Sequence, residues 1–100
     1  MTNKNYVSGR AFEYRRKEAW EAKGYQVIRS AGSHGPFDLI AFHWERPVEL
    51  IQCKRVKTLK AAERLIKAFV EDPPQLPSRF FHQSIEIYVS NDHKVVSRVV

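Results

Sequence analysis

Two stretches of this chain combine residue types that can hold a metal ion beside a phosphate group. Asp38 interrupts an otherwise apolar run of residues 37–44, and Gln52 and Lys54 stand two positions apart further on. A carboxylate within an apolar strand is unfavourable unless a cation meets it. Carboxylate and amide oxygens are hard ligands that Mg²⁺ accepts, and a lysine can orient water and neutralise charge on a phosphate. The spacing therefore favours metal-dependent chemistry at a phosphoester.

A hairpin of strands is needed to bring these side chains together. Because side chains alternate along a strand, Gln52 and Lys54 share one face, while the residues before and between them point to the other face, into the core. Residues 37–44 and 48–55 are expected to be strands joined by a short turn, which makes an antiparallel hairpin the simplest arrangement. Such a hairpin sets the Gln-x-Lys face beside Asp38.

Glu13 is the fourth residue of the predicted site. Ser8 is a good helix N-cap and Gly24 a good C-terminal stop, which predicts a helix over residues 9–23. We expect this helix to pack on the same side of the sheet as the Gln-x-Lys pair. Taken singly, a strand-start Asp is more often a cap, and a helix Glu is more often solvated. Only the ordered combination favours metal chemistry.

The whole chain, residues 1–100, is predicted to form one α/β domain with the element order αβββαββ. Thr58 can cap a second helix, and Pro73 stops its apolar periodicity. No repeat or long linker divides the chain. The expected helices are 9–23 and 59–70, and the expected strands are 25–30, 37–44, 48–55, 85–89 and 94–100.

Composition narrows the classes of partner. The chain carries 17 Lys and Arg against 11 Asp and Glu, a net charge of +6, which favours a polyanion such as nucleic acid. It lacks the unbroken apolar run of about 18 residues that a membrane helix needs, so no membrane partner is expected. Its single cysteine forms no intrachain disulfide, which favours a reducing, intracellular compartment.

The residues from Arg29 through the loop Ser30-Ala31-Gly32-Ser33-His34-Gly35-Pro36-Phe37-Asp38 resemble those of the archaeal-type Holliday junction resolvases. The ordered set of helix Glu, strand Asp and strand Gln-x-Lys is similar to that of the wider PD-(D/E)XK nuclease superfamily. The similarity covers residues 9–56 well, whereas the second half agrees only in its helix-then-strands order.

This resemblance implies a restriction-endonuclease-like core with a central mixed five-stranded sheet flanked by helices. It also implies a homodimeric, magnesium-dependent endodeoxyribonuclease that recognises four-way DNA junctions by shape and cuts two strands symmetrically. Mn²⁺ is expected to substitute for Mg²⁺. The family's catalytic positions fall on Glu13, Asp38, Gln52 and Lys54 with Ser33 near the cut phosphate, and Glu13, Asp38 and Gln52 are the implied metal ligands.

Gln52 departs from the family pattern, which usually has Glu there. The change removes a negative charge beside a dication, worth several kcal/mol at an effective dielectric constant of about 20, partly offset by cheaper desolvation. Glu49 cannot replace it simply, because its odd offset sends it to the opposite face of the strand. Some members of the wider superfamily also carry Gln here, so activity remains the favoured hypothesis.

Basic residues near this segment are expected to contact DNA phosphates. The predicted DNA-binding residues are Arg10, Arg15, Arg16, Arg29, Ser30, His34, Arg55 and Lys57. The ordinary interpretation, a solvated helix face or an idle loop histidine, stands beside this one. Cys53 is expected to be a small core residue rather than a nucleophile.

Apolar residues of the second half suggest a dimer interface, although all of them can also be internal. They are Leu65, Phe69, Val70, Phe80 and Phe81. A two-fold dimer suits a four-way junction, because one subunit per strand gives two related cuts. The leading hypothesis is a junction-resolving endonuclease in the cytoplasm of a prokaryote or of a virus-infected cell. Two alternatives remain: another nuclease of the superfamily, of nicking, repair or restriction type, and a junction-binding module with weakened catalysis.

Overall fold

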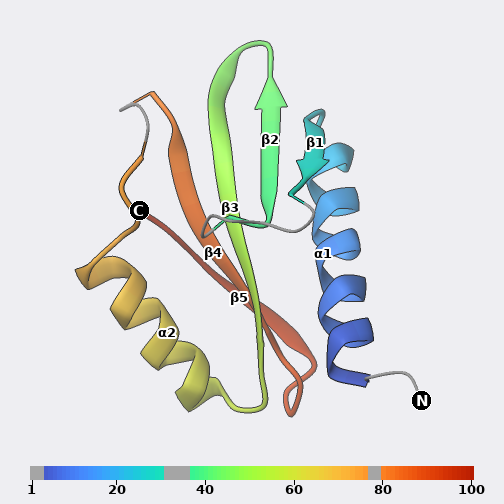
Figure 1. The fold of residues 1–100 in the computed structure, drawn as a ribbon, viewed down its shortest axis with the longest axis vertical. Helices are drawn as coiled ribbons and strands as arrows, with labels where there is room; N and C mark the ends of the chain where they lie inside the picture. Colours follow the sequence, from blue (N-terminus) through green and yellow to red (C-terminus); the bar gives the residue numbers. More distant parts are fainter. Residues whose placement is uncertain (1–3, 31–36, 77–79) are drawn as a thin grey trace.

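The computed structural model is a mixed five-stranded sheet between two helices (Figure 1). It describes the backbone of residues 4–30, 37–76 and 80–100, and side chains from Arg10 onward. The α/β class and the order αβββαββ are confirmed. The elements are α1 (Lys4–Ala22), β1 (Gln26–Arg29), β2 (Leu39–His43), β3 (Arg46–Val56), α2 (Leu59–Glu71), β4 (His82–Val89) and β5 (Lys94–Val99).

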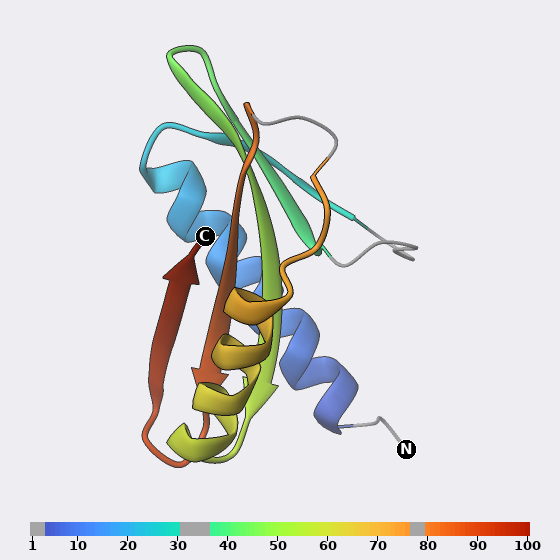
Figure 2. The same cartoon turned by 90° about the vertical axis from the view of Figure 1, so that its left-hand side faces the viewer.

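The strands lie in the order β1-β2-β3-β4-β5, and β3 is the centre of the sheet. β3 pairs antiparallel with β2 and parallel with β4, because the chain crosses over through α2 between them. β1 and β5 add antiparallel edges. Turned by 90°, the molecule shows α2 in front of the sheet and α1 behind it (Figure 2). Each face of the sheet therefore has its own helix.

Each helix covers a separate apolar cluster, so the domain has two small cores. Behind the sheet, Trp20 of α1 packs against a cluster that includes Val27, Leu39 and Ile51. In front, Phe69 of α2 packs against Ile85 and its neighbours in β4. Alternation along the strands assigns successive residues to the two cores. The position of any site residue relative to α1 follows from this alternation.

Gly24 ends α1 as the sequence predicts. Its φ of 95° is the left-handed conformation that glycine adopts without a steric penalty. Tyr25 N–H donates to Trp20 C=O at 3.3 Å and Gly24 N–H to Glu21 C=O at 3.0 Å, which is the Schellman arrangement. The Tyr25 and Trp20 rings then meet edge to face, with centroids 4.9 Å apart. The predicted N-cap is wrong, because α1 begins at Lys4 and Ser8 lies inside it.

The predicted β2–β3 hairpin is confirmed, with Leu39 opposite Ile51. The turn lies at residues 44–45 rather than 45–47, and β3 begins at Arg46. Pro47 is tolerated within β3 because pairing with β4 starts only at Glu49, so the missing N–H leaves that ladder intact. The apolar run of residues 37–44 predicts a strand buried on both faces, and this prediction is wrong, since Phe42 is 39 % exposed.

Thr58 caps α2 as expected, and its hydroxyl accepts the Ala61 N–H at 3.2 Å. The residues suggested for a dimer interface divide between core and surface. Phe69 is buried and Leu65 packs against the same cluster, whereas Val70 and Phe80 are exposed. Phe69 is therefore a core residue, and the internal interpretation holds for it. Within the described part of the chain, neither helix is long and apolar enough to cross a membrane.

Candidate active site

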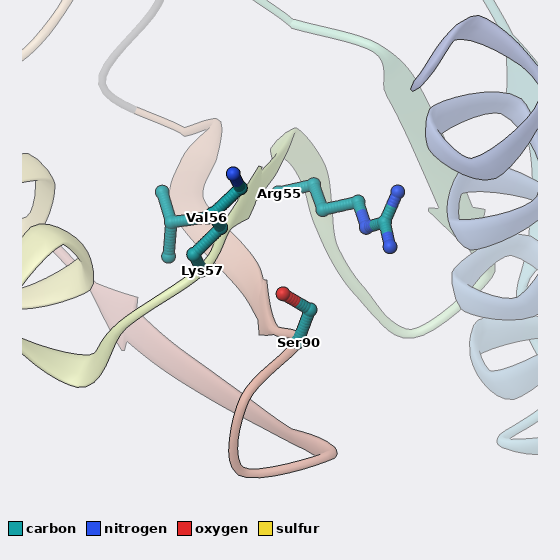
Figure 3. A pocket seen from close by; sticks show the side chains of 4 residues that line it. All are labelled: Arg55, Val56, Lys57 and Ser90. Atoms are coloured by element: carbon teal, nitrogen blue, oxygen red, sulfur yellow. The ribbon is translucent and has the colours of Figure 1, made fainter. Parts of the chain in front are cut away.

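The predicted site residues lie around β3, but they do not share one face of the sheet. Ile51 and Cys53 face α1, where both pack in the cluster that includes Trp20. Gln52 and Lys54 pair across the sheet with Ile85 and Ile87, which belong to the α2-side cluster. The expectation that α1 packs on the Gln-x-Lys face is therefore wrong. A close view at the end of β3 shows the same alternation, with Arg55 directed toward α1 and Val56 toward α2 (Figure 3).

Asp38 lies just before β2, at the end of the β2–β3 ladder. Its backbone N–H donates to Ile51 C=O at 2.9 Å, and its Oδ2 accepts the Cys53 N–H at 2.8 Å. The carboxylate thus takes the place of a backbone acceptor and closes the ladder on either side of Gln52. Among the described residues no hydrogen bond engages Oδ1. Asp38 is both a strand cap and a carboxylate with one oxygen available to a ligand.

Glu13 projects from α1 and forms an ion pair with Arg29 of β1. Arg29 Nε donates to Glu13 Oε1 at 3.0 Å, and both side chains are about four-fifths buried, with 20 % and 22 % exposed. The Arg29 guanidinium also lies 4.9 Å from the centre of the Tyr14 ring. Arg29, predicted to bind DNA, is thus anchored beside the carboxylate that was predicted to bind metal.

The Cys53 thiol shows that Glu13 and Asp38 approach the same part of the sheet. Burial raises the pKa of this thiol, and the negative charges of Glu86, Asp38 and Glu13 raise it further, while Arg16 lowers it. A thiol held neutral is a poor nucleophile, which agrees with its expected role as a core residue. The charges of two predicted metal ligands, Glu13 and Asp38, therefore both act on this thiol, which lies on the α1 side of β3.

Glu86 is the residue of this region that the sequence reasoning missed. Arg16 donates to it twice, from Nε at 2.8 Å and from a terminal nitrogen at 3.2 Å, and the Trp20 ring N–H points at the same carboxylate at 3.3 Å. The Glu86 side chain is only 5 % exposed. The available signal was an acidic residue inside the apolar strand Ile-Glu-Ile-Tyr-Val. Arg16, predicted to bind DNA, is committed to this buried pair, which raises its pKa.

The remaining predicted DNA contacts are spread over the surface near the site. Arg10 and Arg15 are exposed on α1, and Arg10 approaches the Tyr14 ring at 5.8 Å. Arg55 and Lys57 line a cavity of about 370 Å³ together with Val56 and Ser90 (Figure 3). Ser30 is half-buried at the end of β1. Ser33 and His34 lie outside the described residues.

The donor set of this region suits a small hydrated dication only in part. No cluster of three or more His, Cys, Asp or Glu side chains with metal-binding geometry occurs among the described residues. Asp38 Oδ1 and the second oxygen of Glu13 are nevertheless carboxylate donors near one thiol. Mg²⁺ keeps several waters and needs only one or two carboxylates in addition to substrate phosphate. Asp38 and Glu13 are the carboxylates that would hold it, with the Gln52 amide, which lies within β3 on the α2 side, as the third predicted ligand.

The raised pKa of Cys53 predicts a loss of stability at alkaline pH. The unfolded thiol ionises above about pH 8.5, whereas the folded thiol keeps its proton. Above that pH the unfolded state binds fewer protons, so the free energy of unfolding should fall by up to about 1.4 kcal/mol per pH unit. Urea unfolding at a series of pH values from neutral to about pH 10 measures this fall in the free energy of unfolding. Cys53→Ala should show a shallower alkaline decline, and an identical decline in both proteins would contradict the assignment.

No protein-family model matches the chain, and no curated protein matches it.

Proposed function

We propose that this protein is a metal-dependent DNA endonuclease that cuts four-way junctions. The observation that carries the proposal is the Asp38 carboxylate, which accepts the Cys53 N–H at 2.8 Å at the end of the β2–β3 ladder that contains Gln52. The charge of Glu13 acts on the same cysteine from the α1 side. The net charge of +6 supports a polyanionic substrate. The element order αβββαββ supports the resemblance to the PD-(D/E)XK nuclease superfamily.

The scissile phosphate would lie at the start of β2, where Asp38 bonds to the backbone on both sides of Gln52. Glu13 and Arg29 then stand on the α1 side of that phosphate, and Gln52 and Lys54 stand on the α2 side. Mg²⁺, or Mn²⁺ in its place, would supply Lewis-acid activation of the phosphate and would lower the pKa of an attacking water. Lys54 would orient that water, and Ser33 would support the phosphate.

Glu13 has to loosen its bond to Arg29 to serve as a ligand. The Arg29 Nε–H donates to Glu13 Oε1 at 3.0 Å. A substrate phosphate would compete with Glu13 for Arg29, and a metal ion would compete with Arg29 for Glu13. Phosphate oxygens can take over the Arg29 donors, because guanidinium binds phosphate and carboxylate with the same fork geometry. Binding of DNA would thereby free Glu13 Oε1, which with Asp38 would hold Mg²⁺.

A homodimer within a reducing intracellular compartment completes the proposal. Two related active sites suit a four-way junction, since a two-fold dimer matches the symmetry of paired cuts. With Phe69 buried, the interface has to use exposed apolar side chains, of which Val70 and Phe80 belong to the set first suggested. The single, partly buried cysteine is compatible with a reducing environment.

A second function is favoured by the placement of Gln52 and Lys54 on the face away from α1. If these side chains do not join Glu13 and Asp38 around one metal, the protein is a junction-binding module without catalysis. Such a module keeps the basic surface and the fold. It differs from the endonuclease in one respect, since it forms a complex with a junction but no cleavage product.

Substrate choice separates these possibilities. Purified protein is incubated with end-labelled four-way junction, linear duplex of the same sequence and single strand, each with Mg²⁺ or with chelator. We expect cleavage of the junction with Mg²⁺ and little cleavage of the duplex. Equal cleavage of duplex and junction would indicate a nicking, repair or restriction-type nuclease. Junction binding in a gel-shift assay without product would indicate the binding module.

A further inference from the structure

An aromatic pocket opens at the end of the β1–β2 pair that lies away from Asp38. It has a volume of about 380 Å³ and is lined by Gly24, Gln26, Phe42, His43 and Trp44. Gln26 stands directly opposite Phe42 in the two strands, so the amide and the ring share a face. Trp44 lies in the two-residue turn of the hairpin, with its side chain fully exposed (102 %). The pocket plays no part in the proposed cleavage.

His43 holds the turn that carries Trp44 in place. His43 Nδ1 accepts the Glu45 N–H at 3.1 Å, and the His43 ring contacts Tyr25 with centroids 5.1 Å apart. Because Nδ1 is an acceptor, the neutral ring carries its proton on Nε2. That nitrogen faces Gly24, where an added Cβ would stand 3.6 Å away. The pocket thus has a positioned N–H donor, and its glycine wall leaves the space beside that donor open.

These groups match the chemistry of a nucleobase, and we propose that the pocket binds one unpaired base of a nucleic acid. The Phe42 and Trp44 rings offer apolar faces on which a planar ring can stack, which is the common mode of single-strand recognition. The Gln26 amide can both donate to and accept from a base edge, and His43 Nε2 can donate.

The charges around the pocket suit a base that arrives on a phosphate backbone. Lys23 lies 4.6 Å from the centre of the Trp20 ring, and Arg46 lies 5.9 Å from the centre of the Tyr25 ring. Lys23 precedes Gly24 in the chain, and Arg46 pairs with His43 across the hairpin, while Glu45 carries the negative charge of the turn. The sum of these formal charges is therefore positive, in keeping with the net charge of +6 of the whole chain.

The pocket lies on the same hairpin as the candidate site. Phe42 and Asp38 are four strand positions apart, a separation of roughly 13 Å at about 3.3 Å per residue, or about four stacked nucleotides. One strand can therefore pass the candidate site and place an unstacked base between Phe42 and Trp44. This inference rests on the proposed function only in taking nucleic acid as the partner, because base binding needs neither metal nor cleavage.

Tryptophan fluorescence in chelator tests the pocket separately from cleavage. The wild-type protein is titrated with a short thymidine homo-oligomer and with an oligomer of equal charge in which every base is missing. We expect the normal oligomer to quench Trp44 emission and the abasic one to leave it unchanged. Trp44→Leu should lose the quenching and bind the normal oligomer about 5- to 150-fold more weakly, as expected for one lost stacking contact. Val99→Ala, at an exposed site on β5, should match the wild type.

Three results would overturn the proposal. One is equal quenching by the abasic oligomer, since it would assign binding to phosphate alone. Another is unchanged affinity in Trp44→Leu. A third is emission that shifts with protein concentration in the absence of oligomer, because that result would assign the pocket to contact with a second copy of the chain. Circular dichroism of each variant confirms that the fold is retained, which the full exposure of Trp44 leads us to expect.

Discussion

Replacing Asp38 with asparagine is expected to slow metal-dependent junction cleavage about a hundredfold or more while the fold remains intact. A metal ligand contributes several kcal/mol to the transition state, and each 1.36 kcal/mol is a factor of ten in rate. The asparagine side-chain oxygen can still accept the Cys53 N–H that Asp38 Oδ2 accepts at 2.8 Å. What the substitution removes is the negative charge and the second carboxylate oxygen.

The matched controls for this prediction are Asp92→Asn and Asp38→Ala. Asp92 is exposed in the turn between β4 and β5, so its substitution should leave both rate and stability unchanged. Asp38→Ala also removes the cap, and the unpaired Cys53 N–H should lower the free energy of unfolding by about 1–3 kcal/mol. Initial cleavage rates and urea midpoints together separate the two roles. Wild-type cleavage by Asp38→Asn would refute the placement of the metal.

Replacing Arg16 with alanine is expected to lower the free energy of unfolding by about 3 kcal/mol. The substitution leaves the Glu86 carboxylate, 5 % exposed, without its cation. Breaking a buried ion pair from one side typically costs about 3–5 kcal/mol, and the partial exposure of Arg16, 21 %, favours the lower end. Because domains of this size are stable by about 5–15 kcal/mol, the loss should be large in a urea titration.

Two further variants test whether the unpaired charge of Glu86 causes the loss of stability in Arg16→Ala. Arg15→Ala removes an exposed arginine from the same helix and should change stability by no more than about 0.5 kcal/mol. Arg16→Ala combined with Glu86→Gln removes both charges but keeps an acceptor for the Trp20 N–H, which Glu86 accepts at 3.3 Å. This double variant should regain most of the loss. Equal stability of Arg16→Ala and Arg15→Ala would show that the pair contributes nothing.

Local chemistry explains why the fold was largely predictable from the sequence. Gly24 and Thr58 end and begin their helices through backbone and side-chain bonds within a few residues. Alternation correctly placed Gln52 and Lys54 together on one face of the hairpin. Each of these predictions needed only neighbours along the chain.

The position of α1 was not predictable in the same way. A strand covered on both faces has two cores, and the sequence does not state which helix covers which core. Cys53 does point into a core, as predicted, but that core belongs to α1, so Glu13 lies on the thiol side. The Arg16–Glu86 pair joins residues 70 positions apart, and nothing in the sequence near either residue identifies its partner.

The mapping of cut sites on a four-way junction tests the proposed function most directly. Each of the four strands is end-labelled in turn, and wild-type protein is added with Mg²⁺ or with chelator. We predict paired nicks at symmetric positions on two opposing strands, present with Mg²⁺ and absent with chelator. A stable protein–junction complex that yields no nick in Mg²⁺ or Mn²⁺ would contradict the endonuclease and leave the binding module in its place.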